Sequence, residues 1–219
     1  MARNYKAKAL VLGKTKLGES DLILTLLSSD NYQIRAVAKG ARKPGSRLCG
    51  LSEPFTILEA KLHKGKTLDI ISEAKSVQTY SGIRGDYDRL LSGSVVLEMV
   101  GQITNDGDDI SRLYAMTCAF LGALDGAPSE RIPLLTSAFL LKALAMTGYS
   151  PEHELCAKNE NLSNLFRSTF VEVLDSKLGQ AEDTRRQIAD LRQLIAFMEL
   201  HFPVRIRALS GYRKSLTVI

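Results

Sequence analysis

The segment DLILTLLSSDNYQIRAVAK, residues 21–39, decides the fold class, because it reads as two short strands joined by a turn. Residues 21–28 carry apolar side chains toward both faces, which is typical of a central strand. Residues 33–39 alternate small apolar side chains with a second face that carries Arg35 and Lys39. This pattern predicts a sheet with one buried side and one cationic side.

Three further strands are predicted around this pair, over residues 6–12, 54–62 and 67–77. A basic turn at residues 63–66 separates the last two. The apolar phase shifts near Ile57, which indicates a β-bulge. Five short strands with a bulge are typical of a small closed barrel, and basic loops on such a barrel favour an OB-fold.

Beyond Tyr80 the apolar period becomes helical. The stripes predict helices over residues 83–103, 110–124, 131–147, 162–173 and 188–198. The third of these is apolar almost all round, so it should be the buried centre of a bundle. The fold class expected is α+β multidomain, with a five-stranded OB-fold barrel over residues 1–80 followed by an all-α helical bundle over residues 81–219.

Positive charge is concentrated in the first of these domains. Residues 1–80 carry 14 Lys and Arg against 7 Asp and Glu, whereas residues 81–219 carry 15 against 17. A basic module joined to a near-neutral one indicates a polyanion-binding face on the first. The alternative is that the lysines only keep a small sheet soluble.

Composition restricts the class of protein further. Cys49, Cys118 and Cys156 are widely spaced and form no C-x-x-C pair, so we expect reduced thiols and no zinc site. No apolar run approaches the ~18 residues that a membrane span needs. We expect a cytoplasmic, nucleoid-associated protein with no membrane partner.

The densest functional signal is AKGARKPGSR, residues 38–47. Glycine and proline set turns there, while its cations can neutralise successive phosphates. The candidate nucleic-acid contacts in this segment are Lys39, Arg42, Lys43 and Arg47, and those outside it are Arg35, Lys14, Lys16, Lys64 and Lys66. Few aromatic side chains accompany them, so binding should depend on charge and weaken with salt.

Signatures of catalysis are missing from the chain. It contains no G-x-x-x-x-G-K-[ST], G-x-S-x-G or H-E-x-x-H motif. The acids Asp106, Asp108 and Asp109 lie between two predicted helices, where acids usually cap the next helix. We predict no catalytic residue, no cofactor and no enzyme.

Several stretches resemble the RecO family of bacterial recombination mediators. The similarity rests on GESD at residues 18–21, AKGARKPGSRL at 38–48 and LSEPF at 51–55. It continues more weakly through LLSGSVVLEMV at 90–100 and FLLKALAMTGYSPEHELC at 139–156.

This resemblance implies a DNA repair and recombination protein. Members of the family bind single- and double-stranded DNA, anneal complementary strands, and act with RecR to load the recombinase on strands coated by single-stranded-DNA-binding protein. The resemblance implies that Lys39, Arg42, Lys43 and Arg47 contact DNA. The acidic, hydrophobic C-terminal tail of the single-stranded-DNA-binding protein would bind the helical domain, with Arg112 and Arg131 as candidates.

The chain departs from many relatives after Cys156, where the family often has a four-cysteine zinc module. No further cysteine follows, so we predict no metal. Two other functions stay open on the residues alone: a protein-interaction adaptor that docks an acidic partner, and an RNA-binding OB-fold protein.

Overall fold

The computed structural model describes residues 4–104, 112–149, 151–175, 184–201, 206–209 and 212. The chain divides into two compact units. The first contains residues 1–81 and 100–115, and the second contains residues 82–99 and 116–219. The chain therefore passes from the first unit to the second and back before it completes either.

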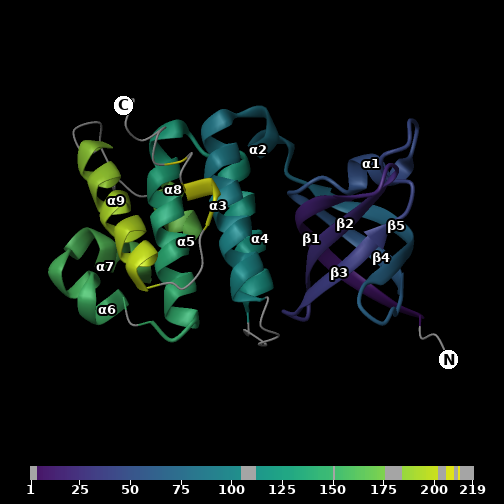
Figure 1. The fold of residues 1–219 in the computed structure, drawn as a ribbon. Helices are drawn as coiled ribbons and strands as arrows, with labels where there is room; N and C mark the ends of the chain where they lie inside the picture. Colours follow the sequence, from purple (N-terminus) through teal and green to yellow (C-terminus); the bar gives the residue numbers. More distant parts are fainter. Residues whose placement is uncertain are drawn as a thin grey trace. The chain divides into compact units, whose positions relative to one another are not determined.

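The first unit is built on a five-stranded sheet (Figure 1). Its strands are β1 (Asn4–Leu17), β2 (Asp21–Ser28), β3 (Gln33–Ala38), β4 (Thr56–His63) and β5 (Asp69–Thr79). They hydrogen-bond in the order β1-β2-β3-β5-β4, and β4 pairs with β1 to close the sheet. Among the described strands, β3 and β5 alone pair in parallel, with Ala36 opposite Asp69. The five predicted strands are confirmed, although their ends shift by up to five residues.

The register of the long strands is irregular at three places. That of β1 against β2 shifts between Val11 and Gly13. That of β4 against β5 shifts between Ile57 and Leu58 and again between Lys61 and Leu62. The shift between Ile57 and Leu58 confirms the bulge predicted near Ile57. Strand β1 continues to Leu17 and not, as predicted, only to residue 12, because its second half pairs with the start of β2. Apolar alternation could not reveal this half, since its side chains are exposed.

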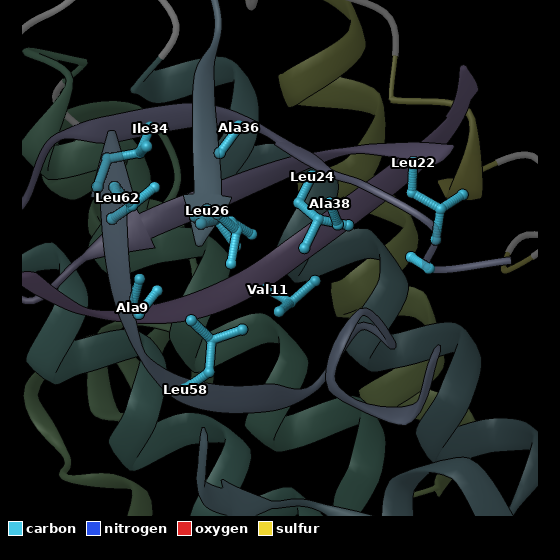
Figure 2. Packing of buried hydrophobic residues seen from close by; sticks show 13 residues of the cluster. Ala9, Val11, Leu22, Leu24, Leu26, Ile34, Ala36, Ala38, Leu58 and Leu62 are labelled. Carbon is cyan, nitrogen blue, oxygen red and sulfur yellow. The ribbon is translucent and has the colours of Figure 1, made fainter. Parts of the chain in front are cut away.

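The core of the unit is made by inward-facing residues of these strands (Figure 2). They alternate along each strand, as period two requires, and most are Leu, Val, Ile or Ala. Leu26 and Leu62 are completely buried, and each such side chain contributes about 1.5–3 kcal/mol to folding. Alanines such as Ala36 and Ala38 leave space for these larger residues in so small an interior.

A short helix, α1 (Arg47–Leu51), links β3 to β4 and was not predicted from the sequence. It leads into Phe55, whose backbone adopts a left-handed φ of 65°. The Phe55 N–H donates to the carbonyl of Val11, and its own carbonyl accepts from Tyr80 N–H. These two bonds and the buried ring hold a conformation that phenylalanine rarely adopts.

Residues 100–115 are part of this same unit, and described residues of the segment hydrogen-bond to β3 and to the β2–β3 turn. The Gln33 side-chain amide donates to the Gly101 carbonyl at 2.8 Å and to Thr104 Oγ1 at 3.1 Å. At the β2–β3 turn, Asn31 Oδ1 accepts the Tyr114 N–H at 2.9 Å. The side chains of Gln33 and Asn31 thus find hydrogen-bond partners in a segment that is distant in the sequence.

The second unit is helical. Its elements, with α3 extending into the first unit, are α2 (Ser81–Gly85), α3 (Tyr87–Ile103), α4 (Leu113–Asp125), the 3-10 turn η1 (Ser129–Arg131), α5 (Ile132–Met146), α6 (Pro151–Glu154), η2 (Cys156–Lys158), α7 (Glu160–Arg167), α8 (Phe170–Asp175) and α9 (Thr184–His201). Helix α5 is buried along nearly its whole length and packs against α7, α8 and α9. The predicted central position of residues 131–147 is confirmed.

Two predicted helices are each divided in the structure, which corrects residues 83–103 and 162–173. Asp86 separates α2 from α3 and accepts the Arg89 N–H through its side chain at 2.9 Å. Thr169 separates α7 from α8 and exchanges hydrogen bonds with Glu172 in a capping box. Asp106, Asp108, Asp109 and Ile110 lie outside the described residues.

Candidate nucleic-acid interface

The basic loop, residues 39–47, leaves β3 and enters α1. Its four cations, Lys39, Arg42, Lys43 and Arg47, are all exposed. Among the described residues, no ion pair joins any of them to an acid. The structure therefore places the four predicted residues of this loop together, with their charge available to solvent.

Three hydrogen bonds fasten this loop to the turn between β1 and β2. The Gly40 N–H donates to Asp21 Oδ1 at 2.7 Å, and the Arg42 N–H donates to the Ser20 carbonyl at 2.9 Å. The Arg42 guanidinium donates through Nη1 to the Gly18 carbonyl, also at 2.9 Å. The loop is therefore held at both residue 40 and residue 42.

Local turns complete the conformation of the loop. Gly40 has a φ of +66°, in the left-handed region that favours glycine. The Lys43 N–H donates to the Gly40 carbonyl, and the Ser46 N–H donates to the Lys43 carbonyl. Successive turns thus lead the chain from the end of β3 into α1.

The groups around the Asp21 carboxylate stabilise its ionised form. The Gly40 N–H, the Ser20 hydroxyl, Lys39 and Lys43 together hold the pKa of Asp21 below its ordinary value, with the Gly40 bond the largest cause. Asp21 is consequently ionised at neutral pH and remains a full acceptor for the loop.

Lys14 and Lys16, in the second half of β1, lie at the same end of the sheet as the basic loop. Lys16 pairs across the sheet with Leu22, which pairs in turn with Ala38 at the end of β3. Two strand spacings, about 10 Å, therefore separate Lys16 from the start of the loop. Lys14 is near as well, but it forms a 2.5 Å ion pair with Glu53.

Arg35 lies on the sheet wall rather than in the loop. It is exposed and pairs across the sheet with Thr25. Its side chain is on the opposite face from the core residue Ala36, as the alternation predicted.

The β4–β5 hairpin, residues 64–68, lies at the other end of the sheet. Because β3 and β5 run in parallel with Ala36 opposite Asp69, residues before Asp69 extend toward the start of β3, away from the basic loop. Figure 1 shows the hairpin and α1 at opposite ends of the strands. The structure therefore does not bring Lys64 and Lys66 together with the loop.

Buried Asp69 organises this hairpin. It accepts a hydrogen bond from the Tyr5 hydroxyl and another from the Gly65 N–H at 3.0 Å, and Lys64 Nζ lies 3.6 Å away. Burial, followed by the bond to Asp69, raises the pKa of Tyr5. Part of the Lys64 charge is thus compensated locally, whereas Lys66 is exposed.

The two residues predicted to bind a protein tail lie in different compact units. Arg112 precedes α4, is exposed and has a φ of 71°. Arg131 ends η1 and is half-buried.

Sequence reasoning missed a second lysine-rich surface, a shallow trough of about 460 Å3 over β1, β4 and β5. Its residues are the triplets Lys6-Ala7-Lys8, Glu59-Ala60-Lys61 and Glu73-Ala74-Lys75. The strand register aligns the three alanines in one row, with charged rows on both sides. Three strands with a charge-Ala-Lys triplet were a signal for this lysine trough in the sequence.

Acids compensate much of the charge in the lysine trough. Lys75 forms an ion pair with Glu59 at 2.8 Å, and Lys61 pairs with Glu73 at 3.5 Å. The bond from Lys75 and its charge, followed by the charges of Lys8 and Lys6, hold the pKa of Glu59 below its ordinary value.

Within the described parts of the chain, no three His, Cys, Asp or Glu side chains are grouped so that they could hold a metal ion. Nor does any described helix combine the length and apolar character needed to cross a membrane.

Comparison with known proteins gives consistent results for both regions. The family model "Recombination protein O N terminal" matches residues 1–80, and "Recombination protein O C terminal" matches residues 84–190. The motifs that carried the resemblance lie in these two ranges.

Three relatives, each named "DNA repair protein RecO", align with most of the chain. The protein of Gloeobacter violaceus is 34% identical over 154 residues, 70% of this chain and 59% of the relative. The protein of Nocardioides sp. is 36% identical over 164 residues, which are 73% of this chain and 66% of the relative. The protein of Pelotomaculum thermopropionicum is 37% identical over 153 residues, which are 70% of this chain and 59% of the relative. The match spans less than two thirds of each relative's length. Because the two family models together match residues 1–80 and 84–190, the chain belongs to the RecO family.

Proposed function

We propose that this chain is a DNA-binding recombination mediator whose first unit holds the phosphate backbone through the basic loop. The observation that carries the proposal is the group of four exposed cations, fastened by hydrogen bonds at one end of the sheet. Such a group releases condensed counterions when it binds phosphates, and it reads no base sequence.

We infer that the first unit is an OB-fold, a class of five-stranded Greek-key barrel that binds oligonucleotides in many proteins. The strand order β1-β2-β3-β5-β4 and the helix between β3 and β4 support this inference. The names of the relatives, which specify DNA repair, support DNA over RNA as the ligand.

The finer parts of the function follow from family membership and remain our proposals. They are binding of both single- and double-stranded DNA, annealing of complementary strands, and recombinase loading with RecR on strands coated by single-stranded-DNA-binding protein. The helical unit would bind the tail of that protein. All these functions are binding events, and none needs a bond to be broken by this chain.

Chemical footprinting tests the location of the DNA. Cys49 is exposed on α1, two residues from Arg47, whereas Cys156 is buried and burial raises the pKa of its thiol. Single-stranded DNA at saturating concentration should slow maleimide modification of Cys49 several-fold and leave that of Cys156 unchanged. Unchanged modification of Cys49 in the presence of bound DNA would contradict the proposed location.

Binding and annealing assays test the ligand class. Fluorescence anisotropy should show single-stranded DNA binding that weakens steeply with salt, and complementary oligonucleotides should anneal faster with the protein present. Tighter binding to RNA of the same sequence would favour an RNA-binding protein. No retention of either nucleic acid at low salt would favour a protein-interaction adaptor.

A further inference from the structure

We propose that Asp21 is a positioning residue for DNA binding: it fixes the basic loop in its binding conformation, although its own charge opposes that of DNA. The inference rests on the proposed function and adds a residue to it. Asp21 begins β2 and is therefore anchored in the sheet, where its neighbour Leu22 is buried.

The three hydrogen bonds that fasten the loop all run in the same direction. All three acceptors lie in the turn of residues 18–21, and all three donors lie in the loop at Gly40 and Arg42. Two of the acceptors are backbone carbonyls, so no side-chain substitution removes them. The carboxylate of Asp21 is the one acceptor among the three that a substitution can delete.

Gly40 and Arg42 lie between two cations, Lys39 and Lys43, whose side chains form no ion pair within the described structure. Tying residues 40 and 42 to the turn orders the backbone that carries Lys39 and Lys43. A surface ordered before binding avoids the entropy of ordering it during binding.

The charge of Asp21, considered alone, predicts the opposite effect on DNA binding. An aspartate beside Lys39 and Lys43 reduces the positive potential that attracts a polyanion. Its removal should strengthen DNA binding if only charge matters, and weaken it if the hydrogen bond to Gly40 matters more. The sign of the change therefore separates the two explanations.

Glu19 provides a matched control in the same turn. It is exposed, and among the described residues it makes no ion pair or hydrogen bond to the loop. Glu19→Ala and Asp21→Ala remove the same charge two residues apart. Asp21→Asn removes the charge but retains an oxygen that can accept the Gly40 N–H.

The experiment measures single-stranded DNA affinity of the full chain at low salt. We expect Asp21→Ala to bind about fivefold more weakly than the wild type, because the loop must be ordered on binding. Glu19→Ala and Asp21→Asn should bind as tightly as the wild type or up to about twofold more tightly. Equal or tighter binding by Asp21→Ala would overturn the inference.

A charge-conserving variant covers the case in which Asp21→Ala fails to fold. Asp21→Glu keeps the charge but moves the carboxylate by one methylene, so we expect it to bind more weakly than Asp21→Asn. The reverse order would overturn the inference. A loop variant, Arg42→Ala with Lys43→Ala and Arg47→Ala, is measured in parallel: if it binds DNA normally, the proposed function fails, whereas if it alone loses affinity, only the role of Asp21 fails.

Discussion

The basic loop and the lysine trough each carry four cations on the same small sheet, yet they differ in how those charges are compensated. Ion pairs with Glu59 and Glu73 engage two of the four lysines in the trough. In the loop, the described structure shows no ion pair to any of the four cations. The number of lysines therefore does not distinguish the two surfaces. Our proposal places the polyanion at the loop because its cations form no ion pair within the described structure and its backbone is hydrogen-bonded to the β1–β2 turn.

The largest expected effect tests this comparison directly. We expect Arg42→Ala, Lys43→Ala and Arg47→Ala together to weaken single-stranded DNA binding roughly 30-fold at low salt and to reduce the salt slope by about 2. Fluorescence anisotropy across a salt series gives both values.

Lys6→Ala with Lys8→Ala is the control on the trough. This pair of substitutions should weaken binding by less than about threefold, through loss of general attraction only. If the trough variant loses as much affinity per charge as the loop variant, affinity follows net charge and the comparison fails.

The next effect concerns the order of the loop backbone. Gly40→Ala should lower the free energy of unfolding by about 1 kcal/mol, because its left-handed φ is costly for alanine. Space is not the cause, since the new Cβ would meet Lys43 Cδ at 3.6 Å and Lys43 Cε at 3.9 Å, both ordinary van der Waals contacts. Gly50→Ala in α1 is the control, and it should be neutral or slightly stabilising in the same denaturant titration. Equal destabilisation by both would show that Gly40 is not special.

A smaller effect comes from releasing one lysine on each surface. Glu53→Gln frees Lys14 near the basic loop, and Glu59→Gln frees Lys75 in the trough. Both add one net positive charge, so general attraction predicts equal gains in DNA affinity. We expect about threefold tighter binding for Glu53→Gln and little change for Glu59→Gln. A larger gain for Glu59→Gln would transfer the proposed site to the trough.

The smallest effect distinguishes the causes of two lowered carboxyl pKa values. Asp21 owes its low pKa mainly to the neutral Gly40 N–H, whereas Glu59 owes its low pKa mainly to Lys75. A folded-state pKa below the unfolded one means that the stabilisation is complete above the ordinary values of 3.8 and 4.5 and is lost as pH falls through the folded pKa. In an NMR titration, added salt should raise the pKa of Glu59 more than that of Asp21. An equal response would mean that ion pairing dominates at Asp21 as well.

Local patterns in the sequence predicted much of the fold. Period-two alternation located five strands, and the phase shift at Ile57 located a bulge that the register confirms. The breaks at Asp86 and Thr169 had local signals too, since an Asp or Thr before a helix caps its first turn. The second half of β1 had none, because its exposed residues are fixed by pairing with β2.

The candidate site was predictable only in part. A run of cations between turn residues indicated the basic loop, because composition is local. The separation of Lys64 and Lys66 from that loop depends on the parallel pairing of β3 with β5, which no pattern in either strand specifies. The bond from Gly40 to Asp21 joins residues 19 positions apart, and it likewise needed the folded chain.

The division of the chain has a consequence for its synthesis. The five strands are complete when Thr79 has emerged from the ribosome. At that point the hydrogen-bond partners of the Gln33 and Asn31 side chains, which are Gly101, Thr104 and Tyr114, have not yet been synthesised. At about 5–20 residues per second, that delay lasts several seconds. The nascent sheet would therefore exist for that time with two polar side chains hydrated by water, and would reach its final state only once part of the helical region had been translated. A fragment that ends at residue 80 would stay in this nascent state.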